Sequence, residues 1–159
     1  MAERDKLHPT DDASPDPGDE LMDADRQAAQ FERVRNAQQT EKAEDYVEMI
    51  DDLINAYGEA RVTDLAQRFG VSHATVNKIV KRLQRDGLVT SRPYRSIFLT
   101  EQGSALAAAS RKRHQIVLNF LRAIGVSARN AELDAEGIEH YVSAETLEAF
   151  AKITSEKDG

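Results

Sequence analysis

The chain has 159 residues, of which 40% are hydrophobic, enough for one medium-sized domain or for two small domains that share an interface. It contains no cysteine, which excludes disulfides, thiol catalysis and cysteine-ligated zinc. It also lacks an apolar run of the roughly 20 residues that a membrane span needs, and its first residues lack the apolar core of a secretory signal. We therefore expect a cytoplasmic protein without a membrane partner. The net charge is −7, but it is unevenly distributed.

Residues 1–40 are expected to form an acidic N-terminal extension. Residues 1–20 are rich in Asp, Pro, Ser and Gly and have almost no apolar side chains. Such a composition buries too little surface to offset the entropy of ordering, so we expect this segment to be disordered. From residue 19 to residue 40 the apolar residues have weak helical spacing, which is compatible with a marginal helix or arm.

The pattern of residues 41–104 predicts a winged helix-turn-helix. Apolar side chains recur at steps of three and four from the first of these residues to Gly58, which indicates an amphipathic helix. A short helix follows, with Thr63 as its expected N-cap and Gly70 as its end. Ser72 is expected to cap a longer helix. The runs LVTS and SIFLT, separated by RPYR, then predict the hairpin that makes the unit winged.

Basic residues gather in this element. Residues 61–95 contain eight Lys or Arg and two Asp or Glu, a net charge of +6 in an otherwise acidic chain. Such asymmetry is typical of a site for a polyanion, although a solvated basic surface has the same composition. Double-stranded DNA is therefore the expected partner, and a winged domain used only for protein contacts is the alternative.

The second helix of a helix-turn-helix reads base edges with its N-terminal part and contacts phosphates around them. Polar groups suited to bases are expected on Thr75, Asn77 and Lys78, and cations suited to phosphates on Lys81, Arg82 and Arg85. The tip of the wing is expected to reach the DNA backbone or minor groove. The predicted DNA contacts are Ser72, His73, Thr75, Asn77, Lys78, Lys81, Arg82, Arg85, Tyr94 and Arg95.

Residues 105–155 are predicted to form a helical dimerisation and metal-binding domain. A long helix is expected from Thr100 to Ala123, so the domain boundary falls inside it. Ser127 opens a further helical stretch, ARNAELDAEGIEHYV, and Ser143 caps a last helix. The expected fold class is thus mainly α.

Acidic residues and histidines supply a second pattern. One acid pair stands three residues apart on the first strong helix, a Glu-x-x-Glu-His run follows later, and one His lies on the long helix between them. Helices that present carboxylates and imidazoles inward at these spacings build metal sites in bundles. Each piece alone is also compatible with a solvated face or a buried structural His. Without thiolates, the set favours Mn²⁺ or Fe²⁺, with zinc not excluded. The candidate ligands are Asp45, Glu48, His114, Glu136, Glu139 and His140.

Five runs of the sequence, in order and over about residues 40–155, resemble the manganese-sensing branch of the diphtheria-toxin-repressor family. They are EDYVEMIDDLI, ARVTDLAQRFGVSHATVNKIVKRLQRDGLV, YRSIFLTEQG, RHQIVLNFLRAIGV and DAEGIEHYVS. The resemblance implies a homodimer that binds Mn(II), then a palindromic operator, and represses manganese-uptake genes. We expect no small organic ligand.

The resemblance also places the family's metal ligands on the six candidate residues, all of which match in type. Iron-sensing relatives have a Met where Asp45 stands and a Cys where Glu136 stands, so both positions favour manganese. Those relatives carry an SH3-like C-terminal domain, which we do not expect here. One departure is Tyr141, where many manganese regulators have a second His, and an accessory ligand at this position is therefore not expected.

Two other functions are compatible with parts of the pattern. The run from Glu136 to His140 is one residue away from the H-x-x-E-H metallopeptidase motif, but its first His is a Glu. The chain has no G-x-S-x-G, P-loop or dinucleotide fingerprint, so we expect no enzyme. A DNA-binding protein with a permanent, structural metal would have the same ligands as one that senses its metal.

Overall fold

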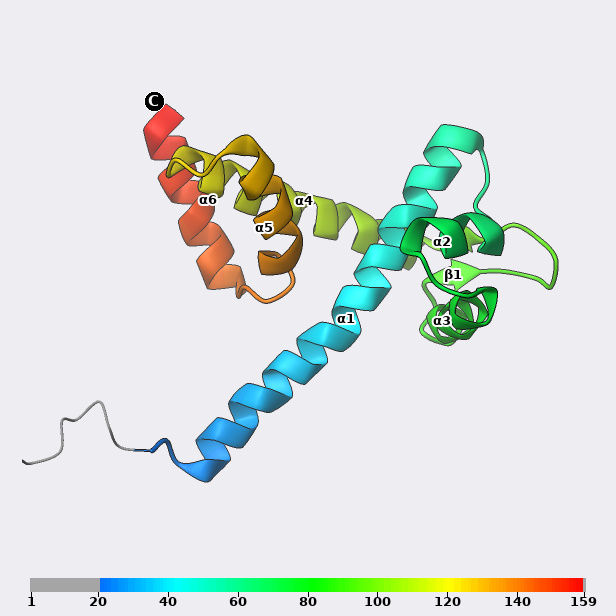
Figure 1. Ribbon diagram of the computed structural model, residues 1–159, viewed down its shortest axis with the longest axis horizontal. Coiled ribbons are helices and arrows are strands. Elements are labelled where there is room, and N and C mark those ends of the chain that lie inside the picture. The colour runs from blue at the N-terminus through cyan, green and yellow to red at the C-terminus, as the bar shows by residue number, and fades with distance from the viewer. Residues whose placement is uncertain (1–20, 159) are drawn as a thin grey trace, which may run out of the picture. The chain divides into compact units, whose positions relative to one another are not determined.

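The computed structural model describes residues 21–158, which are mainly helical, as expected (Figure 1). The expectation of disorder for residues 1–20 lies outside the described residues. The chain divides after Arg33 into two parts. The elements are α1 (Ala24–Tyr57), α2 (Val62–Phe69), α3 (His73–Arg85), β1 (Val89–Thr90), β2 (Phe98–Leu99), α4 (Glu101–Ala123), α5 (Ala128–Ile138) and α6 (Ala144–Asp158).

Helix α1 begins well before residue 41, where the stronger periodicity starts. Residues 24–40 contain no Gly or Pro and several Ala, Gln, Glu and Arg, which are good helix formers, so the backbone stays helical even where no apolar face is buried. In the first part of the chain, residues 24–33 of α1 are exposed, including Phe31 at 58%. The helix ends at Gly58, as predicted, which adopts a positive φ of 80°.

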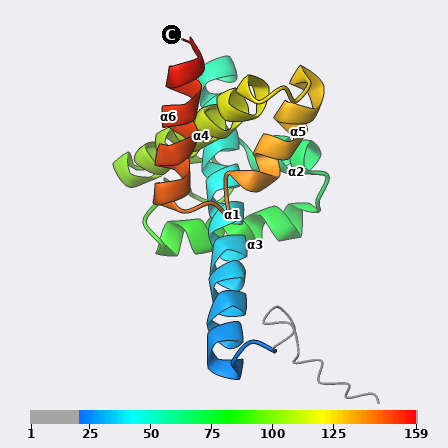
Figure 2. The same cartoon turned by 90° about the vertical axis from the view of Figure 1, so that its left-hand side faces the viewer.

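The winged helix-turn-helix, called the reading head from this point on, has its core between α1, α2 and α3. Ile50 and Leu53 of α1 pack with Leu65 of α2 and Val76 of α3, and all four are buried. α3 is seen end-on in Figure 1 and lengthwise in Figure 2, so it runs across the direction of α1. The apolar stripe of α3 thus faces inward and leaves its polar side free.

The turn of this motif is as predicted, whereas the start of α2 is not. Gly70 ends α2 in the left-handed conformation, and the backbone N–H of Thr75 donates to Ser72 Oγ over 3.1 Å. Thr63 is not the N-cap of α2, because the helix already begins at Val62 and has no side-chain cap. The preceding residue Ala60 is instead tied by its carbonyl to the N–H of Ile97 over 2.8 Å, a tertiary contact that fixes where the helix begins.

The predicted hairpin is present as a short antiparallel pair. Val89 pairs with Leu99 and Thr90 with Phe98. Tyr94 lies in the connecting loop with a φ of 58° and is fully exposed. The wing therefore presents its tip to the surroundings rather than to the core.

The second core lies between α4, α5 and α6. Val117 and Leu121 of α4 pack with Ala131 and Ala135 of α5, and Phe120 and Phe150 are among their neighbours, stacked at a centroid distance of 3.9 Å. α5 and α6 lie along α4 in both views (Figures 1 and 2). Ser127 and Ser143, predicted to open α5 and α6, each accept a backbone N–H three residues on, and so does Thr100 at the start of α4.

Helix α5 is shorter than expected. It ends at Ile138 with Glu139 as its C-cap, and His140 and Tyr141 belong to a turn. The last N–H bonds of the segment run from Glu139 to Ala135 and from Tyr141 to Ile138, so the ladder tightens and stops. The expectation that the helix continues through Val142 is wrong, and α6 in turn runs past Ile153 to Asp158.

Candidate metal centre and nucleic-acid interface

Five of the six predicted metal ligands lie in two groups where α1, α4 and the end of α5 meet. Within each group one ligand atom per residue lies within 4.8 Å of the others. The first group is His114, Glu136 and Glu139. The second is Glu41, Asp45 and His140, in which Glu41 was not predicted.

Glu139 joins the two groups. Its Oε2 lies 3.4 Å from His114 Nδ1, and its Oε1 lies 3.3 Å from His140 Nε2. His114 Nδ1 is also 3.5 Å from Glu136 Oε1, and His140 Nε2 is 3.5 Å from Asp45 Oδ1. The early end of α5 makes this possible, because Glu139 and His140 leave the helix and reach toward α1.

Glu48 is the one predicted ligand outside both groups. Its side chain is partly buried near Ser110 of α4. Burial raises its pKa, against the lowering effects of Ser110 and Arg111, and the nearby carboxylates of Glu136 and Asp45 raise it further. Glu48 therefore belongs to the electrostatic environment of the groups, although the structure does not bring it into either of them.

The donor set of the groups fits a cation. The Glu139 side chain is 3% exposed and the His140 side chain 1%, and neither Glu139 Oε2 nor His140 Nε2 has a hydrogen-bond partner. Burial raises the pKa of Glu139 to about 7, although His140 and His114 lower it. Burial lowers the pKa of His140, but Asp45 and Glu44 outweigh this effect and raise it to about 10. Unpartnered buried oxygen and nitrogen atoms that face one another provide the lone pairs that a hard divalent ion takes.

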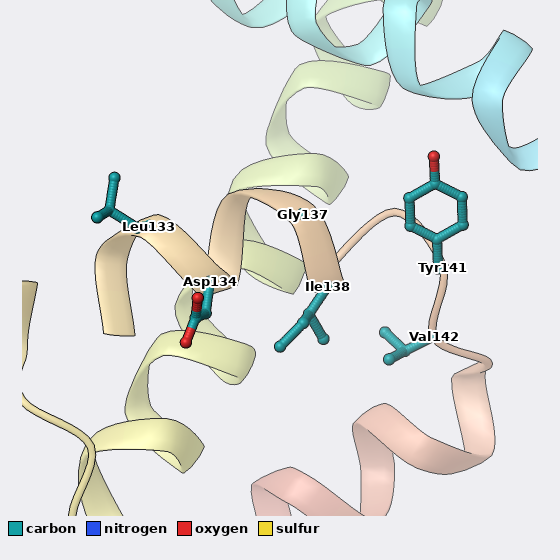
Figure 3. A pocket seen from close by; sticks show the side chains of 6 residues that line it. All are labelled: Leu133, Asp134, Gly137, Ile138, Tyr141 and Val142. Atoms are coloured by element: carbon teal, nitrogen blue, oxygen red, sulfur yellow. The ribbon is translucent and has the colours of Figure 1, made fainter. Parts of the chain in front are cut away.

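Two acids of this site were missed in the sequence: Glu41, which belongs to the second group, and Glu44, which lies beside it. Glu44 is 3% exposed and accepts from His140 Nδ1 over 2.8 Å. Glu41 accepts from the hydroxyl of Tyr141 over 2.9 Å, and Figure 3 shows the Tyr141 ring pointing its hydroxyl toward α1. Glu44 stands three residues before the buried Val47, and this helical spacing was the available indication that it faces inward.

All ten predicted DNA-contact residues are exposed in the structure, on α3, its N-cap and the wing. Lys78, Lys81 and Arg85 line a hollow together with Gln84, which was not predicted. Arg82 lies at 4.0 Å from Asp86. A row of exposed cations along one helix is typical of a surface that contacts phosphates.

Two family models match the chain. The iron dependent repressor N-terminal DNA-binding domain matches residues 38–97, and the iron dependent repressor metal-binding and dimerisation domain matches residues 100–156. The chain is also 50% identical over 135 residues to the transcriptional regulator MntR of Escherichia coli O6:H1, covering 85% of this chain and 87% of that one. The chain belongs to the iron-dependent repressor family.

Within this family the MntR branch is the relevant one. The HTH-type transcriptional regulator MntR of Geobacillus kaustophilus is 38% identical over 114 residues, which cover 72% of this chain and 81% of the relative. The resemblance to the manganese-sensing branch of the diphtheria-toxin-repressor family is thereby confirmed, and the chain is a transcriptional regulator of that branch.

Solved structures of the family have the same fold. The manganese regulator SloR superposes with a TM-score of 0.62 at 27% identity, and a manganese-dependent transcriptional repressor in complex with manganese with 0.61 at 28%. The matches cover 71% and 73% of this chain but 53% and 52% of those chains, so this chain spans about half of their length. None of the helices between residues 21 and 158 has both the length and the apolar character of a membrane span.

Proposed function

We propose that this chain is a cytoplasmic, manganese-dependent transcriptional repressor that binds operator DNA as a homodimer and controls manganese-uptake genes. The observation that supports this most directly is the pair of ligand groups, because they take side chains from α1 of the reading head and from α4 and α5 of the dimerisation module. The proposed ligands are Asp45, Glu48, His114, Glu136, Glu139 and His140.

Manganese is the proposed ion because every donor is a carboxylate oxygen or an imidazole nitrogen. Asp45 and Glu136 provide hard oxygens where iron-sensing relatives have sulfur, and hard ligands suit Mn²⁺, which ranks low in affinity among first-row ions. SloR and the manganese-bound repressor, both similar to this chain, are named for the same metal. Bound Mn²⁺ would offset the negative charge of the four carboxylates among the proposed ligands.

The proposed mechanism uses the position of the groups. Asp45 lies on the same helix as Ile50, which is buried in the core of the reading head. His114 and Glu139 belong to the module that carries the dimerisation domain. Without a cation the carboxylates repel one another, so the relation between the two modules loosens. The metal ion binds more tightly when the two modules are held together than when they are loose. It therefore favours one spacing of the two recognition helices in a dimer, by as much as these two affinities differ.

A two-fold dimer matches half-sites spaced by the DNA repeat, which is why a palindromic operator is the proposed target. α3 is proposed to lie in the major groove, with Tyr94 and Arg95 of the wing at the backbone or minor groove. The dimer contact is proposed to use the second matched domain. Leu133, which is 64% exposed, lines an apolar hollow at the end of α5 (Figure 3). We propose that a second copy of the chain covers this hollow. No catalytic step is proposed.

The test is a titration of Mn²⁺ against operator affinity, at fixed salt and with chelated protein as the start. We expect affinity to rise with free Mn²⁺ in the micromolar range, and Glu139→Gln to lose this rise. A chelated protein that binds its operator as tightly as the loaded one would refute metal sensing and favour a permanent structural ion. A hydrolase assay with Mn²⁺ should show no activity.

A further inference from the structure

Glu44 is a buried carboxylate that the proposed ligand set does not use. It lies on α1, one residue before Asp45, and is 3% exposed. Its Oε2 lies 2.8 Å from Nδ1 of His140, which follows α5, and its Oε1 forms an ion pair with Arg113 of α4. One side chain of α1 thus contacts two other segments of the chain, and both of its oxygens are engaged.

Stability alone does not account for such a group. Removing a carboxylate from water is costly, and an ion pair in the interior is often no better than apolar side chains of the same volume. Arg113 compensates the charge of Glu44, yet its Nε has no hydrogen-bond partner, so the network is not optimised for the fold. A role in directing its third member, His140, accounts for the arrangement better.

The geometry defines that role. A neutral imidazole that donates its single proton from Nδ1 to a carboxylate has a lone pair on Nε2, which is the form in which a histidine binds a metal ion. In this structure Nε2 of His140 has no hydrogen-bond partner and faces Asp45 Oδ1 at 3.5 Å and Glu139 Oε1 at 3.3 Å. Rotation of the ring by half a turn would lose the bond to Glu44.

We propose that Glu44, held in place by Arg113, is a positioning residue that fixes the ring of His140 so that its Nε2 binds the metal ion. This inference rests on the proposed function, because it requires that His140 is a ligand. Arg113 precedes His114 in α4, so the same ion pair also relates the ring of His140 to the helix that carries the other imidazole.

The decisive variants are Glu44→Ala and Glu44→Gln, with Glu32→Gln as a control that removes one exposed carboxylate from α1. Affinity for Mn²⁺ is measured by competition with a fluorescent chelator. Loss of a partner that orients a metal-bound His typically weakens binding by about 10–100-fold, which is the expectation for Glu44→Ala. Glu44→Gln should lose less, since its amide oxygen still accepts from Nδ1, and Glu32→Gln should match the parent.

A second measurement separates positioning from a structural role. The protein is loaded with ¹¹³Cd²⁺ as a diamagnetic probe, and ¹⁵N spectra show which nitrogen of His140 is coupled to the metal. We expect Nε2 in the parent and in Glu44→Gln, and a mixture of Nε2 and Nδ1, or no coupling, in Glu44→Ala. If Glu44→Ala does not fold, Arg113→Gln, which removes the cation that holds the Glu44 carboxylate in place, provides the comparison, with a mixture of Nε2 and Nδ1 or no coupling expected.

Unchanged Mn²⁺ affinity and pure Nε2 coupling in Glu44→Ala, or in Arg113→Gln where Glu44→Ala does not fold, would overturn the inference while leaving the proposed function intact. A parent that binds no Mn²⁺, or whose His140 is not coupled to the metal, would overturn both. Equal and complete loss of binding in Glu44→Gln and Glu44→Ala would show instead that Glu44 is itself a ligand.

Discussion

Lys81 provides the sharpest test of the reading surface. It is exposed on α3, lines the hollow with Lys78 and Arg85, and has no ion pair among the residues that the structure describes. Its neighbour Arg82, by contrast, lies 4.0 Å from Asp86. Lys81→Ala therefore removes a charge without leaving a partner unpaired, and Ala preserves the helix. Any change in DNA binding then reports a lost DNA contact.

The magnitude follows from counterion release. Each phosphate contact contributes about 0.9 to the slope of log affinity against log salt, and a dimer would lose two contacts, so the slope should fall by about 1.8. Between about 50 mM and 200 mM salt, a fourfold change, parent and variant should therefore diverge by roughly 12-fold in relative affinity. The loss should be the same on operator and on unrelated duplex, because phosphates carry no sequence information.

The assay is fluorescence anisotropy with a labelled operator and a labelled non-specific duplex, at four salt concentrations and saturating Mn²⁺. Lys152→Ala is the matched control, since it removes the same charge from an exposed position on α6. An unchanged slope for Lys81→Ala, or an equal change in the control, would refute the placement of α3 along the phosphates.

Four further outcomes are expected. Asp45→Met should lift the operator response to Fe²⁺ relative to Mn²⁺ while the fold is kept, and an unchanged metal ranking would remove Asp45 from selectivity. Gly103→Ala should destabilise the chelated protein by about 1–3 kcal/mol or more in thermal unfolding, because a Cβ there would meet a backbone oxygen at 2.0 Å. Gly137→Ala, with nothing within 4 Å, should instead stabilise it by about 0.5–1 kcal/mol. The hydrogen bond from Ser96 lowers the pKa of Glu59, so its contribution to the stability of the wing is present above the usual pKa of the carboxyl and is lost as pH falls. Hydrogen exchange in the wing should therefore distinguish Glu59→Gln from the parent at neutral pH and not in acid.

The sequence predicted those features that depend on neighbours in the chain. Ser72, Ser127 and Ser143 cap helices because a hydroxyl reaches a backbone N–H three residues on, whatever lies around it. Thr63 also carries a hydroxyl but does not cap α2. The β-bridge between Ala60 and Ile97 makes the helix begin earlier, at Val62. Local chemistry thus predicts the helices, whereas a tertiary contact determines where α2 begins.

The candidate site divides in the same way. Helical spacing identified Glu136 and Glu139 as candidate ligands. It did not predict that His140 lies in a turn beyond the end of α5. Glu44 and Glu41 were missed because their partners lie 96 and 100 residues further along the chain. No periodicity within α1 reveals that a carboxylate on its surface meets an imidazole from another element.

The structure of α1 connects the two proposed halves of the function. Tyr46 and Ile50 are buried in the reading-head core, whereas Asp45 and Glu44 turn to the cluster around His140. A helix is stiff over these two turns, so closing the acidic cluster around a cation moves the head as a unit with α1, with its core contacts kept. Couplings between sites in proteins are typically about 1–3 kcal/mol, or about 5–150-fold in affinity. A response of that size needs no rearrangement of the head itself, since a change in its attachment alters the spacing of both recognition helices in a dimer.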